Sequence, residues 1–326
     1  MWKLGDINID GVVVLAPMAG ITSSGYRQFM KPFGVAVSVS EMVSDMGLIY
    51  DNEETKKYVI YEEEHITGVQ LFGHDPKNMA EAAKISLKLN PNIDFFDINM
   101  GCPVPKVVST GAGSALLNTP KLCGDIVRAI KAVTDKPVTA KIRLGWDNNS
   151  LTYLEVIHEL EEAGVAAIAI HARTRKEMYM GEPHFEILKD LRKQMHVPLI
   201  ISGNIYTLDD AIRAKDITGA DAIMVARGAM GNPWLIKQID HYYRTGERLE
   251  NKTVLEQIDY CLELADYLIK EKGEETAMRI YRGISTKFFS GFKNAKYYKN
   301  RLCTELTDRQ SLVNILNDLK NDLINQ

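Results

Sequence analysis

Short apolar, β-branched runs alternate with longer amphipathic segments through most of the chain, and each run precedes a helix-like segment. The eight runs predicted to be strands are residues 12–17, 35–40, 68–72, 94–99, 137–144, 166–171, 197–202 and 222–226. Segments 76–89, 120–133 and 152–163 have the apolar periodicity of helices. Eight strand–helix units predict an α/β fold, the (β/α)8 TIM barrel, whose usual size is about 250 residues. A doubly wound sheet is the alternative, but its glycine-rich fingerprint does not follow the first strand.

The strand pattern ends near residue 251, and a helical pattern continues from there. Apolar residues recur at three- and four-residue intervals at Val254, Ile258, Leu262, Ala265 and Leu268. Residues 307–324 predict a last helix with one apolar face. We therefore expect a barrel over residues 1–246 and a small C-terminal helical domain over residues 247–326.

Composition and charge narrow the class of protein. Hydrophobic residues make up 45% and charged residues 25% of the chain, as in ordinary globular proteins. The net charge of −4 does not predict a nucleic-acid binder, so such a partner would need a local basic patch. The four cysteines form no CxxC pair and suggest neither a metal site nor a disulfide framework. Without a signal-peptide core or a membrane-length apolar run, the expected location is the cytoplasm, with no membrane contact and no evident obligate protein partner.

Candidate chemistry gathers where the predicted strands end, since a barrel of this type has its active site at the carboxyl ends of its strands. Cys102 follows the fourth strand in a loop fixed by Pro103, either as a reactive thiol or as a small hydrophobe near the surface. Lys141 and Arg143 share one face of a buried strand, which requires anionic partners or water. The other polar residues at strand ends are Gln70, Asn99, His171 and Arg173.

Two turns and one basic segment predict contacts with phosphate. The turns at Ser202–Gly203–Asn204 and Ala226–Arg227 follow strands seven and eight, where backbone N–H groups commonly bind a phosphate. From residue 279 to 301 no Asp or Glu interrupts the basic residues Arg279, Arg282, Lys287, Lys293, Lys296, Lys299 and Arg301. This segment favours an RNA-phosphate surface over a merely solvated face. Its aromatic residues could either stack on bases or pack in the helical core.

Six motifs occur in the order found in bacterial tRNA-dihydrouridine synthases, and the chain resembles that family from about residue 10 to the basic segment. They are APMAGIT at 16–22, DINMGCP at 97–103, GSALL at 113–117, KIRLGW at 141–146, HARTR at 171–175 and GNPW at 231–234. The resemblance implies an FMN-binding barrel followed by a helical domain that binds tRNA. It also implies NADPH-dependent reduction of selected uridines to 5,6-dihydrouridine, with hydride passing from flavin N5 to uracil C6.

The resemblance assigns roles to individual residues. Cys102 would donate the proton to uracil C5, and a thiol is mostly protonated near pH 7, as this role requires. The residues implied to bind the cofactor are Pro17, Met18, Ala19, Gln70, Lys141, His171, Ser202, Gly203, Asn204, Ala226 and Arg227. It implies that Asn99 and Arg173 in the barrel bind the substrate, and the basic segment predicts the same for Arg279, Arg282, Lys287 and Lys293 in the tail.

The chain departs from the family pattern at three places. Relatives often have Asn-Gly-Asp at 202–204, Gly-Arg at 226–227, and a more basic loop after the cysteine, where this chain has only Lys106. Backbone N–H groups could still bind phosphate at both turns. The alternatives are a flavin-dependent pyrimidine or dihydroorotate dehydrogenase, which leaves the basic tail unexplained, and a non-catalytic RNA-binding protein, which leaves Cys102, Lys141 and His171 unexplained.

Overall fold

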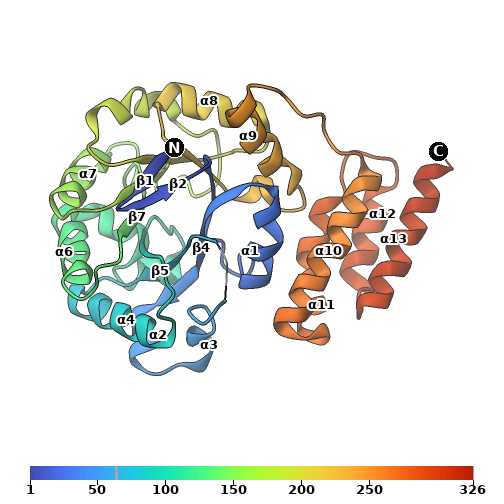
Figure 1. Ribbon diagram of the computed structural model, residues 1–326, viewed down its shortest axis with the longest axis horizontal. Helices are drawn as coiled ribbons and strands as arrows, with labels where there is room; N and C mark the ends of the chain where they lie inside the picture. The colour runs from blue at the N-terminus through green and yellow to red at the C-terminus, as the bar shows by residue number, and fades with distance from the viewer. Residues whose placement is uncertain (63–64, 326) are drawn as a thin grey trace.

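The computed structural model describes residues 1–62 and 65–325 and shows a closed barrel of parallel strands followed by a group of helices (Figure 1). The barrel strands are β3 (Val13–Leu15), β4 (Val35–Ser44), β5 (Thr67–Phe72), β6 (Phe95–Met100), β7 (Val138–Arg143), β8 (Ala167–His171), β9 (Leu199–Ser202) and β10 (Ala222–Val225). Each strand pairs with its neighbour in sequence, and β10 closes the barrel on β3. All eight strands overlap the predicted apolar runs, so the predicted TIM barrel is confirmed.

Helices surround the barrel, and local sequence signals start several of them. Pro76 and Pro120 occupy the first turns of their helices, where a backbone N–H would have no acceptor within the helix, so proline costs no hydrogen bond. Thr207 and Asp210 form a capping box at the start of another such helix, residues 208–218. The helices of this part are α1 (Ser24–Met30), α2 (Asp45–Ile49), α3 (Glu53–Lys56), α4 (Pro76–Leu89), α5 (Pro105–Val108), α6 (Pro120–Lys131), α7 (Tyr153–Glu162), α8 (Leu208–Thr218) and α9 (Trp234–Thr245). The short 3-10 helices are η1 (Lys31–Phe33), η2 (Gly113–Asn118), η3 (Phe185–Leu188), η4 (Leu191–Gln194) and η5 (Arg227–Ala229).

The connection between β8 and β9 corrects one expectation, because the predicted strand–helix unit has no α-helix there. Only η3 and η4 lie between the two strands. Pro183 restricts the segment before η3, and Asp190 adopts a left-handed conformation between η3 and η4. The chain therefore forms a loop of bends and turns after β8.

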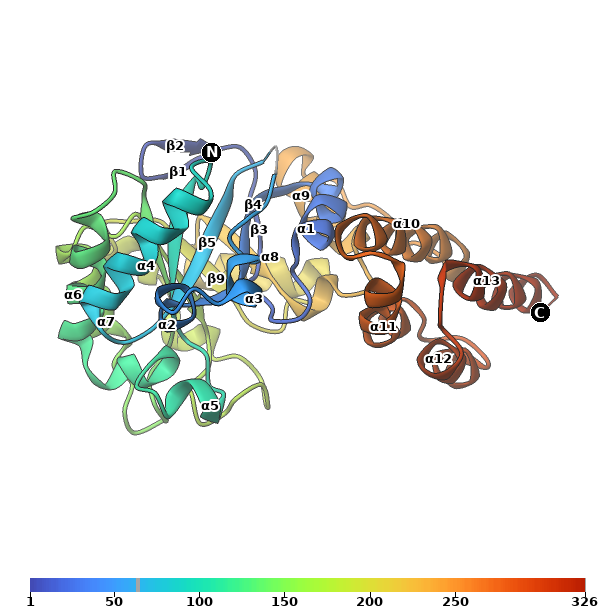
Figure 2. The ribbon, with the colours of Figure 1, turned by 90° about the horizontal axis from the view of Figure 1, so that it is seen from below.

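A short N-terminal hairpin, which the sequence pattern did not predict, covers the other end of the barrel. β1 (Trp2–Leu4) pairs with β2 (Ile7–Ile9), and Trp2, Leu4 and Ile9 pack against the barrel interior. Figure 2 shows this hairpin at one end of the barrel and α5, which follows β6, at the opposite end. Ligand access is thus left to the end where the strands finish.

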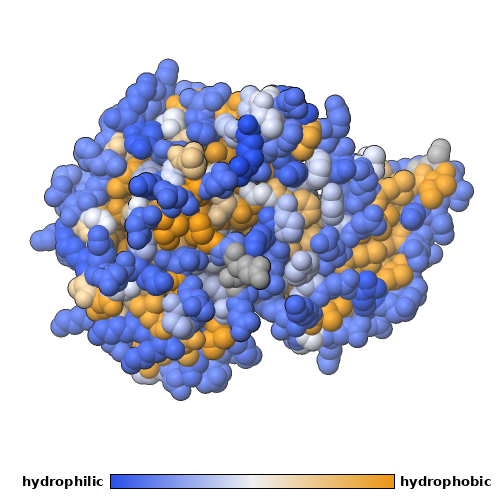
Figure 3. Space-filling view, in the orientation of Figure 1, coloured by the Kyte–Doolittle hydropathy of each residue, from blue (hydrophilic) through white to orange (hydrophobic). Residues whose placement is uncertain are grey.

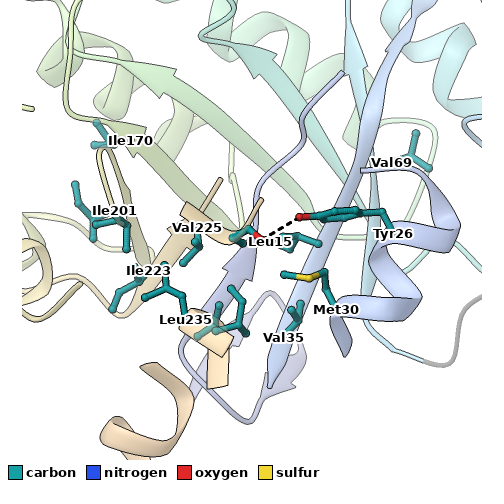
Figure 4. Packing of buried hydrophobic residues seen from close by; sticks show 14 of the residues in the cluster. Leu15, Tyr26, Met30, Val35, Val69, Ile170, Ile201, Ile223, Val225 and Leu235 are labelled. Atoms are coloured by element: carbon teal, nitrogen blue, oxygen red, sulfur yellow. Dashed lines mark hydrogen bonds between the residues drawn. The ribbon is translucent and has the colours of Figure 1, made fainter. Parts of the chain in front are cut away.

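The main core lies between the strands and the surrounding helices. Leu15, Val225 and Leu235 are completely buried there, and the close view shows them in the same cluster as Met30 and Val35 (Figure 4). The buried Tyr26 hydroxyl donates to the carbonyl oxygen of Ala229 at 3.4 Å. Burial of apolar side chains at about 25 cal/mol per Å² makes this layer the main source of barrel stability.

The C-terminal part consists of α10 (Val254–Lys272), α11 (Glu274–Ser285), η6 (Thr286–Phe288), α12 (Ala295–Thr304) and α13 (Arg309–Ile324). It joins the barrel through residues 246–253, which separate α9 from α10. Most of the aromatic residues of the basic segment are core residues, since Tyr281, Phe288, Phe289 and Tyr298 are buried. Figure 3 shows apolar surface over these helices on the side in view.

Helix α10 packs against α1 of the barrel (Figures 1 and 2). Two edge-to-face aromatic pairs form this junction, Phe29 with Tyr267 at 6.1 Å and Phe33 with Tyr260 at 5.2 Å between ring centroids. Glu271 of α10 accepts hydrogen bonds from the Ser23 hydroxyl at 2.7 Å and from the N–H of Gly25 at 2.9 Å. A carboxylate from the C-terminal part therefore satisfies the first turn of α1.

Within residues 1–62 and 65–325, no helix has the length and apolar character needed to cross a membrane. The same residues contain no group of three or more His, Cys, Asp or Glu side chains arranged to hold a metal ion. All four cysteines are free thiols.

Candidate active site

A cavity of about 350 Å³ opens at the carboxyl ends of the barrel strands. The predicted site residues that line it are Pro17, Met18, Ala19, Asn99, Cys102, Lys141, His171, Ser202, Gly203, Asn204, Ala226 and Arg227. Residues at or just after the ends of β3, β6, β7, β8, β9 and β10, which are far apart in sequence, thus meet at one place. Gln70 and Arg173 do not line the cavity; they lie behind Asn99 and His171.

Asn99 and Cys102 are joined by the loop that ends β6. The side-chain oxygen of Asn99 accepts from the N–H of Cys102 at 2.8 Å and from that of Gly101 at 3.2 Å. The Cys102 carbonyl accepts from the N–H of Ser114 at 3.0 Å and from its hydroxyl at 2.9 Å. Cys102 is 9% exposed, and its backbone is held on both sides at the cavity wall.

Lys141 brings a cation to the cavity from the strand next to β6. It is paired in register with Asn99. Burial lowers the pKa of its ammonium group to about 8; the charge of Arg143 adds to this effect, and Asp97 and Cys102 oppose it. No hydrogen-bond acceptor contacts this ammonium group in the described part of the chain. Lys141 is therefore suited to an electron-rich ligand that enters the cavity.

Two buried arginines hold the loops around the cavity. Arg143 donates to the carbonyl oxygens of Gly101 at 2.7 Å, Thr174 at 2.9 Å and Met178 at 2.7 Å. Burial lowers its pKa to about 10. These bonds connect the Cys102 loop to the loop after β8. The sequence position of Arg143, two residues after Lys141, did not predict this structural role.

Arg173 holds the loop after β8 and orients His171. It donates to the carbonyl oxygens of Met180, at 3.0 Å, and Gly181. Its guanidinium also lies 3.1 Å from Nε2 of His171. Because arginine only donates, Nε2 of His171 accepts, and the ring of a neutral His171 carries its proton on Nδ1. Burial and the charges of Arg143 and Lys141 lower the pKa of His171 well below its usual value, so the ring is neutral.

The turn after β9 has the geometry of an anion site. Gly203 and Asn204 both have positive φ, 137° and 44°, and their N–H groups donate to no acceptor among the described residues. A Cβ atom at position 203 would lie 2.9 Å from Cβ of Pro183, so the turn requires glycine. Arg227 donates to the Asn204 side-chain oxygen at 3.4 Å. Successive free N–H groups beside a guanidinium are typical of a phosphate site.

Two tyrosines at the mouth of the cavity were not predicted from the sequence. The guanidinium of Arg227 lies 5.3 Å from the ring centroid of Tyr179 and 5.8 Å from that of Tyr206. Tyr179 also lies 5.4 Å from the Arg143 guanidinium. Both tyrosines belong to loops, where no periodic pattern marks a residue that turns toward a cavity.

The predicted RNA-binding residues of the tail differ in their surroundings. Arg279, Lys287 and Lys293 are exposed. Arg282 is half-buried and donates from Nε to the carbonyl oxygen of Leu306 at 2.8 Å. Arg301 pairs with Glu305 at 2.9 Å and Asp318 at 2.8 Å, so its charge is balanced locally. The exposed residues are the ones with side chains available to a polyanion.

Comparison with known proteins gives a consistent result. The family model described as dihydrouridine synthase matches residues 14–324. The tRNA-dihydrouridine synthase B of Shewanella oneidensis is 36% identical over 281 residues, covering 86% of this chain and 87% of that protein. A probable tRNA-dihydrouridine synthase of Rickettsia conorii is 35% identical over 320 residues, covering 98% and 93%.

Solved structures with the same fold are more distant in sequence. An old yellow enzyme homologue from Zymomonas mobilis has a TM-score of 0.54 at 13% identity, covering 78% of this chain and 94% of that one. A histamine dehydrogenase from Rhizobium sp. 4-9 has a TM-score of 0.56 at 12% identity, covering 81% and 50%. These two similarities concern the barrel fold alone. Because the family model and the curated relatives extend over nearly all of its length, the chain belongs to the dihydrouridine synthase family.

Proposed function

We propose that this protein reduces specific uridines of tRNA to 5,6-dihydrouridine, with FMN as bound cofactor and NADPH as reductant. The observation that carries the proposal is the meeting of Cys102 and Lys141 at one cavity, beside the turns that suit a phosphate. The names of the relatives give the substrate as tRNA, and the cytoplasm is the corresponding proposed location.

The residues around the cavity fit a flavin nucleotide. Lys141 presents an ammonium group without an acceptor, and the 203–204 turn presents two free N–H groups. Pro17, Met18 and Ala19 would lie along the ring system, Lys141 would face its electron-rich edge, and the turns with Arg227 would hold its phosphate. When bound and reduced, FMN supplies a hydride.

The chain's own residues would contribute a proton donor held at a fixed position. Saturating the uracil C5–C6 bond requires a hydride at C6 and a proton at C5. Cys102 is a thiol on the cavity wall and would deliver that proton from Sγ to C5. Asn99, Ser114 and Arg143 hold the loop that carries this thiol, so its direction is fixed before the substrate binds.

The C-terminal helices would bind the tRNA. Arg279, Lys287 and Lys293 are exposed on a chain whose net charge is −4, and they can contact phosphates without breaking an ion pair described in the structure. Stacking on the segment's aromatic residues is not the basis of this binding, because most of those rings are buried. Binding is expected to be mainly electrostatic.

Replacing the thiol tests the proposal. Cys102→Ala should keep its flavin and its reduction by NADPH, but oxidation of the reduced protein by unmodified tRNA should slow by about 10²–10⁴-fold. The control is Cys123→Ala, because Cys123 is buried in α6 with its thiol directed to the Leu116 carbonyl. Dihydrouridine formed at the wild-type rate by Cys102→Ala would contradict the proposed acid.

A further inference from the structure

The GNPW motif at residues 231–234 begins at the rim of the cavity. Met230 lines the cavity, and Gly231, which follows it, is buried with a φ of 73°. The loop just before the motif is held by α1, because the carbonyl oxygen of Ala229 accepts from the Tyr26 hydroxyl at 3.4 Å. The motif therefore connects a fixed part of the cavity rim to the start of α9.

Gly231 touches the main chain of the C-terminal part. A Cβ atom at position 231 would lie 2.5 Å from the carbonyl oxygen of Lys287, and closer still to the carbonyl carbon of Lys287 and the nitrogen of Phe288. These atoms belong to the main chain of η6, so no change of rotamer could relieve the overlap. Phe288 is buried among the C-terminal helices, which fixes η6 to them. Only glycine at position 231 lets η6 lie directly on the cavity rim.

This contact places one basic residue next to the cavity. Lys287 is exposed, and its main chain touches the residue that follows Met230 of the cavity lining. A nucleotide that inserts its base into an enzyme pocket keeps its backbone outside, so the neighbouring phosphates lie along the rim of that pocket. An ammonium group on a flexible stem at the rim suits such a phosphate.

We propose that Gly231 joins η6 to the cavity rim as one tRNA-binding surface, on which Lys287 contacts a phosphate adjacent to the target uridine. This inference rests on the proposed function, because it takes the reacting base to be a uridine of tRNA. It gives Lys287 a defined place on the substrate, whereas exposure and charge alone do not distinguish it from Arg279 or Lys293. Gly231 is a positioning residue, since it acts through η6 rather than by touching the tRNA.

A substitution that changes no charge tests this surface. Gly231→Ala forces η6 and the rim apart, so Lys287 should lose its phosphate although the lysine is still present. Fluorescence anisotropy of labelled tRNA across a salt series should then give a slope of log K against log salt that is smaller by about one. The affinity at low salt should fall about tenfold, roughly the value of one contact to a charged group. An unchanged slope would overturn the inference.

Two controls separate the contact from its surroundings. Gly246 also has a positive φ, 79°, but a Cβ atom there meets nothing within 4 Å among the described residues, so Gly246→Ala adds strain without a clash. Trp234→Phe removes the bond from Nε1 to the carbonyl oxygen of Glu250, in the segment between α9 and α10. Both controls should keep the wild-type affinity and slope. A slope reduced equally in either control would overturn the inference, because strain or the connecting segment would then explain it.

Footprinting of the wild-type, flavin-loaded protein tests the surface without a substitution. Bound tRNA should protect Lys287 from acetylation and Met230 from hydroxyl-radical oxidation over the same range of tRNA concentration. The fully exposed Met1 should stay reactive and serves as the internal control. Protection of Lys287 without protection of Met230 would place the tRNA away from the rim and overturn the inference, even if Gly231→Ala did not fold.

These measurements are independent of catalysis. Loss of flavin from Gly231→Ala with an unchanged salt slope would make Gly231 part of the flavin site and would also overturn the inference. Failure of the proposed function would appear differently, as a wild-type protein that binds tRNA with the expected salt dependence and footprint but forms no dihydrouridine in it.

Discussion

Replacing Lys141 by methionine should stabilise the protein without flavin and weaken its binding of flavin. Lys141 is half-buried at the cavity wall, and its ammonium group has no hydrogen-bond acceptor in the described part of the chain. Methionine has a similar length and fills the same space without a charge. In the flavin-free protein the variant therefore removes the desolvation cost of the Lys141 charge. In the flavin-loaded protein it removes the proposed favourable contact between the ammonium group and the flavin.

The magnitude follows from the pKa of this group. Burial lowers the pKa of Lys141 from 10.5 to about 8, and one pKa unit corresponds to about 1.4 kcal/mol, so the charge costs about 3 kcal/mol of folding free energy. The cost is complete below pH 8, where the group is protonated in both the folded and unfolded states. It declines as pH rises from 8 to 10.5, because the folded state then releases its proton first. The attraction to Asp97 raises this pKa and is already included in it, so the variant is expected to gain about 1–3 kcal/mol at pH 7.

Urea denaturation of the flavin-free wild type and Lys141→Met, followed by tryptophan fluorescence, measures this difference. The variant should unfold at higher urea at pH 7, and the two curves should converge as pH approaches 10.5. Added FMN should stabilise the wild type more than the variant, because only a ligand bound to the folded state raises stability. A variant less stable than the wild type at pH 7 would refute the reasoning and make Lys141 a structural ion-pair partner of Asp97.

Five other substitutions have defined outcomes. Lys287→Gln and Lys293→Gln should each reduce the slope of log K for tRNA against log salt by about one, measured by fluorescence anisotropy, and wild-type slopes would place the contacts elsewhere. Arg282→Gln should also lower the melting temperature, since it loses a bond to the Leu306 carbonyl worth about 1 kcal/mol. Gly203→Ala should reduce the flavin content of the purified protein, because its Cβ meets Pro183 in a positive-φ turn. Glu271→Gln should speed proteolysis between α9 and α10 by weakening the bonds to α1.

The barrel could be predicted because each strand leaves a local signal. Parallel strands covered on both faces become continuous apolar runs, and all eight such runs correspond to strands. The hairpin formed by β1 and β2 gave no comparable signal, because strands of three residues are too short for a pattern. The missing helix after β8 depends on backbone conformations at Pro183 and Asp190, and a short apolar segment does not distinguish a 3-10 turn from an α-helix.

The sequence predicted which strand ends contribute residues to the site, but not which of those residues contact one another. Position on a strand brought Asn99, Cys102 and Lys141 to the cavity, because carboxyl ends of parallel strands meet. It could not show that Gln70 faces Asn99 rather than the cavity, since that depends on the register between β5 and β6. Tyr179 reaches the cavity through loop geometry that arginine side chains impose.

The junction between α1 and α10 has a consequence for the choice of uridine. Phe29, Phe33 and Glu271 connect the C-terminal helices directly to α1 and η1, which follow the first barrel strand. In the proposed complex, the fixed distance from these helices to Cys102 then determines which uridine of the folded tRNA reaches the thiol. A change in the length of residues 247–253 should leave this distance unchanged. A substitution at Phe33 or Tyr260 should instead reorient the C-terminal helices and bring a different nucleotide to Cys102.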